Sequence, residues 1–229
     1  MIAKHPFYSE SATQDTLAKK PPDTIMYLHF DQLSPSQRYF TMTQSILPRP
    51  IAWVLSDNGD GSHNLAPFSY FNAVCSDPPL IMLSIGHKPD GSRKDTLVNI
   101  REREHFVVHI PHSKQAAQVT ESSRTLEHGV SELDSLDMAL TEFEGFNLPR
   151  LAECRLAFAC QRYQIQELGN GPQFLVLGEI KQLYASDDVA TVNDSGRLTL
   201  DANAIDPLAR LGSSEYGTLG KVIDVPRPK

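Results

Sequence analysis

The sequence predicts a mainly β protein with flanking helices, an α+β fold built around a barrel. Short apolar runs, rich in β-branched and aromatic residues, recur at close spacing between clusters of Pro, Gly and Asp. Two longer strand-like segments follow in the second half of the chain. Short strands at close spacing are typical of a barrel or a sandwich, and the two long segments would close a barrel.

The expected strands follow one another along the chain. The apolar run 51–55 precedes the turn DNGDG, whose Asn58-Gly59 and Asp60-Gly61 pairs predict a hairpin. Further strands are expected over 68–74, 80–85 and 105–110. The two long strands are expected within 151–168 and 173–186, joined by the Gly-Asn-Gly-Pro turn between them.

Helices are expected over 95–104, 113–123 and 131–140, where helix formers follow a capping residue or a proline. The tail after Asp206 contains Gly212, Gly217 and Gly220, which predict a loop. About the first 24 residues show no sustained apolar period and are interpreted as a surface arm. We therefore expect an N-terminal arm over 1–40 and one domain over 41–229.

Composition excludes several classes of protein. The formal charge of −7 argues against general nucleic-acid binding, although a local basic site remains possible. Cys75, Cys154 and Cys160 lack CxxC spacing, so buried free thiols are expected and a disulfide framework is not. The sequence shows neither a secretory signal nor an apolar run long enough to span a bilayer, so we expect a cytoplasmic protein without membrane contact.

Three segments then stand out: RPIAWV at 49–54, NLAPFSYFNAV at 64–74 and KPDGSRKDTLVNI at 88–100. Together they resemble the flavin reductase-like, FMN-binding split-barrel family, and in particular its flavoredoxin-type members. The likeness continues through PPLIMLSIG, LGEI and PLARLGSSEY, in the expected order, over nearly all of the chain after about residue 40. The resemblance implies an FMN-binding split β-barrel and a homodimer.

The resemblance also implies a cofactor site. Residues after the first hairpin would lie along the flavin ring and ribityl chain, largely through backbone groups, and Tyr70 would complete that wall. The cofactor-binding residues so implied are Arg49, Pro50, Ile51, Asn64, Leu65, Ala66, Pro67, Phe68, Ser69, Phe71, Asn72, Ser92, Lys94, Asp95 and Thr96. The tail 210–216 is expected to contribute to the same pocket.

Physical chemistry supports these assignments independently. A flavin ring needs an apolar floor with a few polar partners, which the small, aromatic and hydroxyl residues of 64–73 can supply. The FMN phosphate carries a charge of about −1.5 to −2, so an acidic protein must offer a local cation. Ser92, Lys94 and Thr96 offer donors where a loop enters a helix, and Arg49 could add a forked donor. Asp95 is assigned to capping that helix and orienting Lys94.

Other interpretations of the same residues are less favoured. Lys94 could be a solvated surface charge, and Phe68, Tyr70 and Phe71 could be core residues, as at least one of them must be. His105, His109 and His112 could suggest a metal site, but no acidic or thiol ligand accompanies them. The DNGDG loop fails the calcium-binding pattern, and a buried, inert thiol is the preferred interpretation of Cys75.

We therefore expect an oxidoreductase in which NADH or NADPH delivers hydride to bound FMN and a second acceptor takes the electrons. GxGxxG is absent, so nicotinamide would stack over the flavin and not bind a Rossmann domain. No catalytic residue is assigned, because the flavin supplies the redox chemistry. The alternatives are an FMN-binding electron carrier or cofactor store without nicotinamide turnover and, more remotely, a flavin-free interaction domain.

Overall fold

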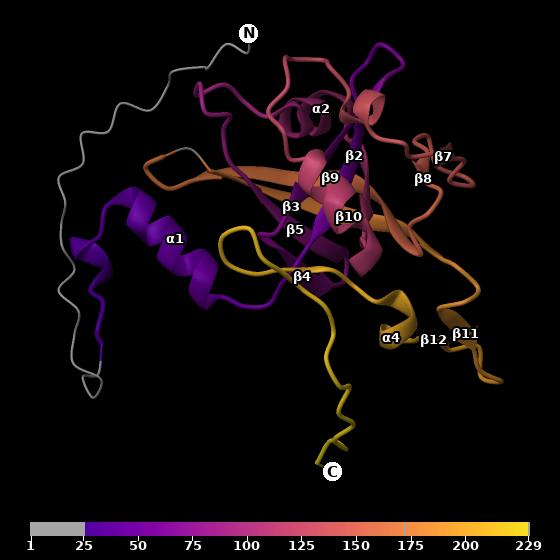
Figure 1. The fold of residues 1–229 in the computed structure, drawn as a ribbon. Helices are drawn as coiled ribbons and strands as arrows, with labels where there is room; N and C mark the ends of the chain where they lie inside the picture. Colours follow the sequence, from indigo (N-terminus) through magenta and orange to yellow (C-terminus); the bar gives the residue numbers. More distant parts are fainter. Residues whose placement is uncertain (1–25, 172, 229) are drawn as a thin grey trace, which may run out of the picture. The chain divides into compact units, whose positions relative to one another are not determined.

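The computed structural model describes residues 26–171 and 173–228 (Figure 1). By its internal contacts the chain divides into two compact units, Met1–Arg38 and Tyr39–Lys229. The described part of the first unit contains the 3₁₀ helix η1 (Phe30–Gln32) and the start of helix α1 (Pro35–Ser45). The arm expected over the first 24 residues lies outside the described residues.

One antiparallel sheet dominates the second unit. Its strands, in the order β3-β2-β6-β9-β10-β5-β4, are β3 (His63–Phe68), β2 (Ala52–Asp57), β6 (His105–His109), β9 (Leu156–Leu168), β10 (Gln173–Ala185), β5 (Pro79–Ile85) and β4 (Phe71–Ser76). The β2–β3 hairpin and the two long strands were predicted from the sequence and are confirmed.

The sheet closes on itself through a two-residue connection. Strands β3 and β4 are the two ends of the sheet order, yet only Ser69 and Tyr70 separate them along the chain. Three residue steps span at most about 11 Å, so the two edges must lie close together. No ladder joins β3 to β4 in the described chain, so the barrel is split along this seam. The single strand expected over 68–74 is therefore wrong, because the chain changes sheet edge at Ser69.

Short elements surround the barrel. They are α2 (Asp95–Arg103), η2 (Ser113–Gln115), α3 (Ala116–Glu121), η3 (Glu132–Ser135), α4 (Ala202–Ile205) and the small strands β7 (Leu140–Thr141), β8 (Arg150–Leu151), β11 (Ala190–Val192) and β12 (Leu198–Leu200). Helix α2 was expected and packs against β2 (Figure 1). The segment expected as a helix over 113–123 forms η2 and α3.

Two sequence-based expectations for these outer elements are wrong. The helix expected over 131–140 is only the single turn η3, because Leu133, Leu136 and Met138 all pack on the core at a spacing that a continuous helix does not provide. The tail expected as a loop contains β13 (Ala209–Arg210) and β14 (Tyr216–Gly217), which form a sheet with β1 (Arg49–Pro50). Gly217 thus lies in a strand.

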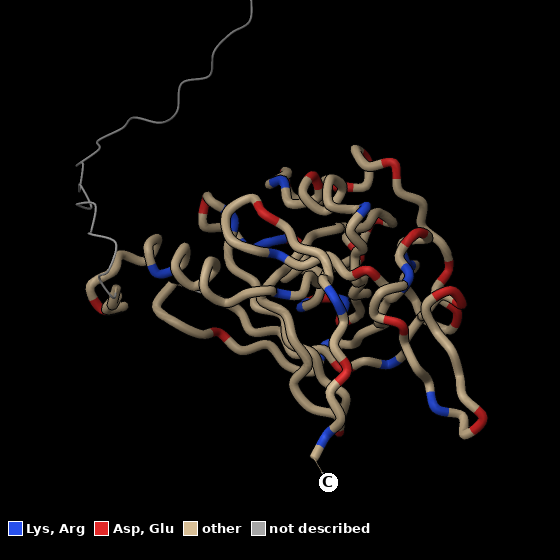
Figure 2. The backbone as a smooth tube through the Cα atoms, turned by 60° about the horizontal axis from the view of Figure 1, so that its bottom comes forward, with Lys and Arg blue, Asp and Glu red and all other residues tan. Residues whose placement is uncertain are grey.

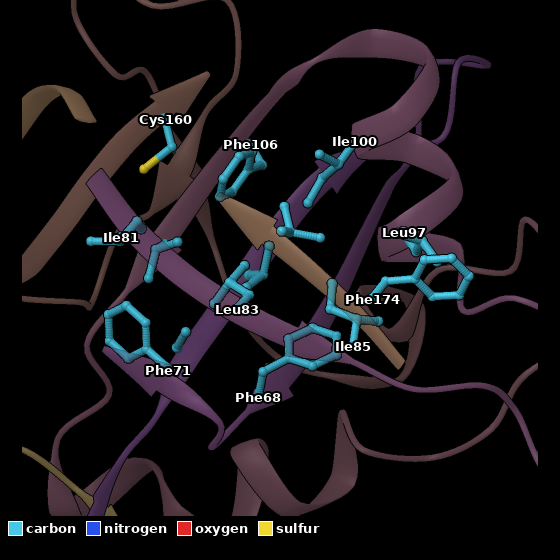
Figure 3. Close-up of a cluster of buried hydrophobic side chains, with 14 residues drawn as sticks. Phe68, Phe71, Ile81, Leu83, Ile85, Leu97, Ile100, Phe106, Cys160 and Phe174 are labelled. Atoms are coloured by element: carbon cyan, nitrogen blue, oxygen red, sulfur yellow. The ribbon is translucent and has the colours of Figure 1, made fainter. Parts of the chain in front are cut away.

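Side chains that point alternately to the two faces of the sheet form two hydrophobic clusters. Ala52 and Val54 of β2 face the first cluster, with Leu83, Phe106 and the α2 residue Leu97. Figure 3 shows the labelled side chains of this cluster converging on one another from the strands and from α2. Trp53 and Leu55 of β2, and Ile51 just before the strand, face the second cluster, under α3 and the loops around η3. Strand β2 is therefore buried on both faces, which explains its unbroken apolar run.

Two of the three cysteines lie in these hydrophobic clusters and the third does not. Cys154 and Cys160 are buried, and burial raises the pKa of the Cys154 thiol to about 12 and raises that of Cys160 as well. Cys75 is exposed, so the expectation of a buried thiol there is wrong. It lies on the edge strand β4 at an irregularity of the ladder, where the outer face has no covering layer.

Charge is distributed without a dominant patch. Figure 2 shows acidic and basic residues interspersed along the described chain. None of the helices in the described part is both long and apolar enough to cross a membrane.

Candidate functional site

A cleft opens where the end of β3 meets the start of α2. Its walls come from β3, from the first turn of α2 and the loop that leads into it, from the segment that follows α3, and from η3. The lining residues are Asn64, Ala66, Pro67, Lys88, Lys94, Asp95, Thr96, Ser122, Ser123, Arg124, Thr125, Leu126 and Glu132. Segments far apart in the sequence therefore meet at this one place.

Two further hollows adjoin the cleft, and Pro67 borders all three. One is bounded by Ile51, Ser69 and the tail residues Arg210 and Tyr216. The other is bounded by Ser69, Tyr70, Ser84 and Gln173, and shares Lys94 with the cleft. The open surface of β3 thus joins a charged cleft to two more apolar hollows.

Lys94 is the free cation of the cleft. It is half-buried as the N-cap residue of α2, and its ammonium lies 5.7 Å from the centre of the Phe68 ring. No residue in the described ranges accepts a hydrogen bond from it. Burial lowers the pKa of Lys94, the neighbouring Lys88 lowers it further, and Glu132 raises it. A partly desolvated ammonium with unused donors is suited to an anion.

The first turn of α2 adds backbone donors. The amides of Leu97 and Val98 donate to the Lys94 carbonyl at 3.0 and 3.2 Å. The two preceding amides, of Asp95 and Thr96, have no acceptor among the described residues. Free N–H groups at the start of a helix attract negative charge, so they and Lys94 favour the same kind of ligand.

Asp95 does not have the role expected for it. Its carboxylate contacts the Lys88 ammonium at 2.7 Å and the His128 ring nitrogen Nδ1, and no side chain caps α2. Asp95 therefore orients Lys88 and not Lys94. Lys88 also donates to the Leu126 carbonyl at 3.2 Å, so this pair fastens the loop after α3 to the start of α2.

Three other predicted donors are engaged within the protein. The Asn64 amide donates to the Thr96 hydroxyl at 2.8 Å, and both side chains are buried. The Ser92 hydroxyl donates to Asp90 at 2.7 Å in an exposed turn that does not line the cleft. The structure thus gives Asn64 and Thr96 a place in the cleft wall and separates Ser92 from it.

Arg49 is also committed to internal contacts. It is buried, and its guanidinium donates to the carbonyls of Thr43, Ile46 and Leu211, the last two at 2.8 Å, and to the Ser69 hydroxyl at 3.4 Å. These bonds fasten β1 to the end of α1 and to the tail hairpin. The forked donor expected for a phosphate is therefore used by backbone carbonyls.

The predicted flavin wall separates into buried and open positions. Ile51, Leu65, Phe68 and Phe71 are core residues, although Phe68 also borders a hollow. Ala66, Pro67, Ser69 and Tyr70 are half-buried and border the open surface, whereas Pro50 and Asn72 are exposed. Tyr70 is therefore the aromatic residue of this wall that is most open to a ligand, and burial raises its pKa.

A comparison with known protein families identifies the family of this chain. Residues 43–199 match the family model described as a flavin reductase like domain. The chain belongs to this family. The resemblance that the three sequence motifs indicated is confirmed.

Solved structures similar to this flavin reductase like domain agree. Nitrilotriacetate monooxygenase component B from Bacillus cereus has a TM-score of 0.79 and 29% identity, covering 89% of this chain and 100% of that chain. The 2-nitrobenzoate 2-nitroreductase of Pseudomonas fluorescens has a TM-score of 0.76 and 30% identity, covering 89% and 96%. A flavin reductase with a split barrel domain from Shewanella frigidimarina has a TM-score of 0.75, 22% identity and coverage of 88% and 100%. The last likeness shows the split-barrel fold.

Sequence reasoning did not name several residues that line the cleft of this flavin reductase like domain. The missed residues are Lys88, Ser122, Ser123, Arg124, Thr125, Leu126 and Glu132. In the run Ser122–Thr125 the two serine hydroxyls donate to carbonyls of α3, and Arg124 pairs with Glu121 at 3.0 Å, so these donors are engaged within the protein. Nothing local to that run or to Glu132 indicates that it meets β3, because the contact arises only when the barrel closes.

The histidines of β6 have structural roles. His109 is fully buried, its Nδ1 lies 3.0 Å from the Trp53 carbonyl, and its Nε2 accepts from the Leu151 amide at 2.9 Å. Both ring nitrogens are thus satisfied by backbone groups. Over the described ranges, no three His, Cys, Asp or Glu side chains gather in a way that could hold a metal ion.

Proposed function

We propose that this chain binds FMN, accepts hydride from NADH or NADPH on it, and passes the electrons to a second acceptor. One observation carries the proposal. The half-buried Lys94 ammonium, without an acceptor in the described chain, lies in a cleft at the start of α2, beside the open surface of β3. A phosphate at Lys94 and a flat ring along β3 would satisfy both features.

The residues present fit an FMN molecule. Lys94, the free amides of residues 95 and 96, and the Thr125 hydroxyl would hold the phosphate. Pro67, Ser69 and Tyr70 would lie against the ring, with Ile51 and the tail residue Tyr216 bordering the adjoining hollow. When bound, the flavin supplies hydride and electron transfer. Arg49 and Ser92 have no place in this proposal as direct ligands.

The protein contributes binding, orientation and exclusion of water. Buried Asn64 and Thr96 hold the cleft wall through their mutual hydrogen bond, and the Lys88–Asp95 pair holds the loop beside it. The hollow bordered by Tyr70, Ser84 and Gln173 leaves room for a nicotinamide against the flavin. No acid or base is assigned, because hydride transfer between the two rings does not require one.

The relatives support an oxidoreductase. The two solved structures near 30% identity are named as a monooxygenase component and a nitroreductase. Both names describe redox proteins, and both chains are covered almost completely by this one.

Two measurements on the purified protein test the proposal. Mass spectrometry of the small molecule released on denaturation should give FMN, and a colourless protein that fails to take up added FMN would overturn the proposal. Anaerobic NADH or NADPH should then bleach the yellow protein within turnover times. A protein that stays coloured with both nucleotides would be an electron carrier or cofactor store.

A further inference from the structure

Glu132 places a buried carboxyl group in the same cleft as Lys94. It opens η3, which Ser131 caps, and only 7% of the residue is exposed. One carboxyl oxygen accepts the Leu65 amide of β3 at 2.8 Å. The amide of Glu132 itself is a second backbone donor to the carboxyl. No side chain among the described residues donates to it, so the group, which lines the cleft, can still form a hydrogen bond to a ligand there.

The charges that face Glu132 come from several elements. Lys94 and Asp95 belong to the start of α2, Lys88 to the loop before it, and Arg124 to the loop after α3. Lys88 is already paired with Asp95, and exposed His128 contacts Asp95 from its other side. On β3, His63 meets η3 through its backbone carbonyl, while the charges that act on its ring are those of Asp57 and Asp60.

These contacts leave too little positive charge for two anions. Asp95 already neutralises Lys88, and the exposed Arg124 is paired with Glu121. Lys94 is therefore the half-buried cation that both Glu132 and a phosphate would share. A carboxylate beside a phosphate dianion in a partly desolvated cleft is a like-charge pair, which is costly. Burial raises the pKa of Glu132 and the Leu65 amide opposes that rise. Protonation is therefore the accessible way to remove the repulsion.

We infer that Glu132 takes up one proton from solvent when the cleft binds a phosphomonoester dianion, and that its carboxyl group then donates a hydrogen bond to the phosphate. The inference rests on the proposed function, since FMN supplies the phosphomonoester. In the step, a carboxylate and one solvent proton become a carboxylic acid, and no other bond is made or broken. Glu132 is thus a binding residue that favours the phosphorylated flavin and links its retention to pH.

The first test uses the wild-type apoprotein and needs no variant. FMN titrations by calorimetry, in buffers of different ionisation enthalpy at about pH 8, should show net uptake approaching one proton, because the phosphate itself is already a dianion there. The FMN dissociation constant should rise about tenfold per pH unit above the pKa of Glu132. Riboflavin, which lacks the phosphate, should show neither effect. FMN binding without proton uptake would overturn the inference.

Variants then assign the proton. Glu132→Gln keeps an acceptor for the Leu65 amide and a donor for the phosphate, so it should bind FMN without proton uptake and with little dependence on pH. Asp134→Asn, an exposed acid in the same turn, should behave like the wild type. His128→Gln should also retain the uptake. Uptake that survives in Glu132→Gln, or that disappears in His128→Gln, would place the proton elsewhere.

The outcomes separate this inference from the proposed function. If neither FMN nor riboflavin binds, the proposed function fails and the inference fails with it. If FMN binds with an affinity independent of pH, the proposed function stands and the role of Glu132 is refuted. Should Glu132→Gln fail to fold, the buffer dependence of the wild type still decides.

Discussion

Removal of the Lys94 side chain should weaken the binding of FMN and leave the binding of riboflavin nearly unchanged. Lys94→Ala should weaken FMN binding about 10- to 100-fold, the range expected for one charge-assisted hydrogen bond, because the phosphate would lose its cation. Riboflavin binding should change little. Fluorescence titration of the apoprotein with both flavins measures this, and equal loss for the two would contradict a phosphate contact.

Arg93→Ala is the matched control for Lys94→Ala. Arg93 is the adjacent cation, exposed, and its guanidinium lies over the Phe174 ring, outside the cleft. Its removal should leave FMN affinity within about twofold of the wild type, since an exposed charge contributes little.

His109 should make the fold sensitive to mild acid. Burial lowers its pKa to about 4, so the folded protein keeps the ring neutral where the unfolded chain, near 6.5, binds a proton. The stability contributed by the neutral ring is therefore complete above about pH 6.5 and declines as the pH falls toward 4. Between pH 7 and 5 the loss should be about 2 kcal/mol.

Denaturant unfolding at the two pH values measures the His109 effect. His109→Gln should lower stability at pH 7 but flatten the decline toward pH 5. His105→Gln, on the same strand but only half-buried, is the control and should leave the decline unchanged. A decline that persists in His109→Gln would assign it to other groups.

At the scale of single residues, the sequence indicated which side chains line the cleft better than it indicated their interaction partners. Lys94 and Pro67, which the sequence motifs assigned to one site, line the same cleft, because short motifs fix residue type and local position. The interaction partners of Asp95 and Arg49 were not predictable from the sequence. Those partners, Lys88 with His128 and the carbonyls of Ile46 and Leu211, are chosen by the closed barrel and not by sequence spacing.

At the scale of elements, strand β10 should tolerate no side chain at Gly178. A Cβ there would overlap the end of the fully buried Phe106 ring of β6 and lie 3.2 Å from a further ring carbon. Gly178→Ala should therefore lower the free energy of unfolding by about 1 to 3 kcal/mol, the usual cost of overpacking. Gly220→Ala, which meets no atom within 4 Å, should change stability little in the same denaturant series. An unchanged Gly178→Ala protein would contradict the tight β6–β10 packing.

Elements with strong periodicity were the most predictable. The β2–β3 hairpin, helix α2 and the pair β9–β10 follow from turn residues and apolar pattern alone. The break at Ser69 and the tail hairpin were missed, because each exists through pairing with a distant strand. Strand β13 pairs with β1, and β4 pairs with β5 on the other side of the seam.

At the scale of the whole barrel domain, the way the sheet closes explains why the cleft lies beside β3. The chain passes from the last residue of β3 to the first of β4 across the seam, so β3 has no strand on its outer edge. The space beside that edge is bordered by α2 and by the segment after α3. The proposed site is thus the part of the barrel that its own strands leave uncovered.

The second unpaired edge, strand β4, predicts a homodimer. Beside it lies an apolar groove bordered by Met42, Ile46, Met82 and Leu175, and exposed Val74 extends the apolar surface along the strand. An unpaired edge strand beside an apolar groove favours association with a second copy of the chain. Pairing would satisfy the backbone groups of the edge and bury the groove. Light scattering after gel filtration should give twice the chain mass. Ile46→Asp should shift the protein toward monomer, whereas Val192→Asp, at a more exposed position on the β11 hairpin, should not. A monomeric wild type at micromolar concentration would rule out this use of the groove.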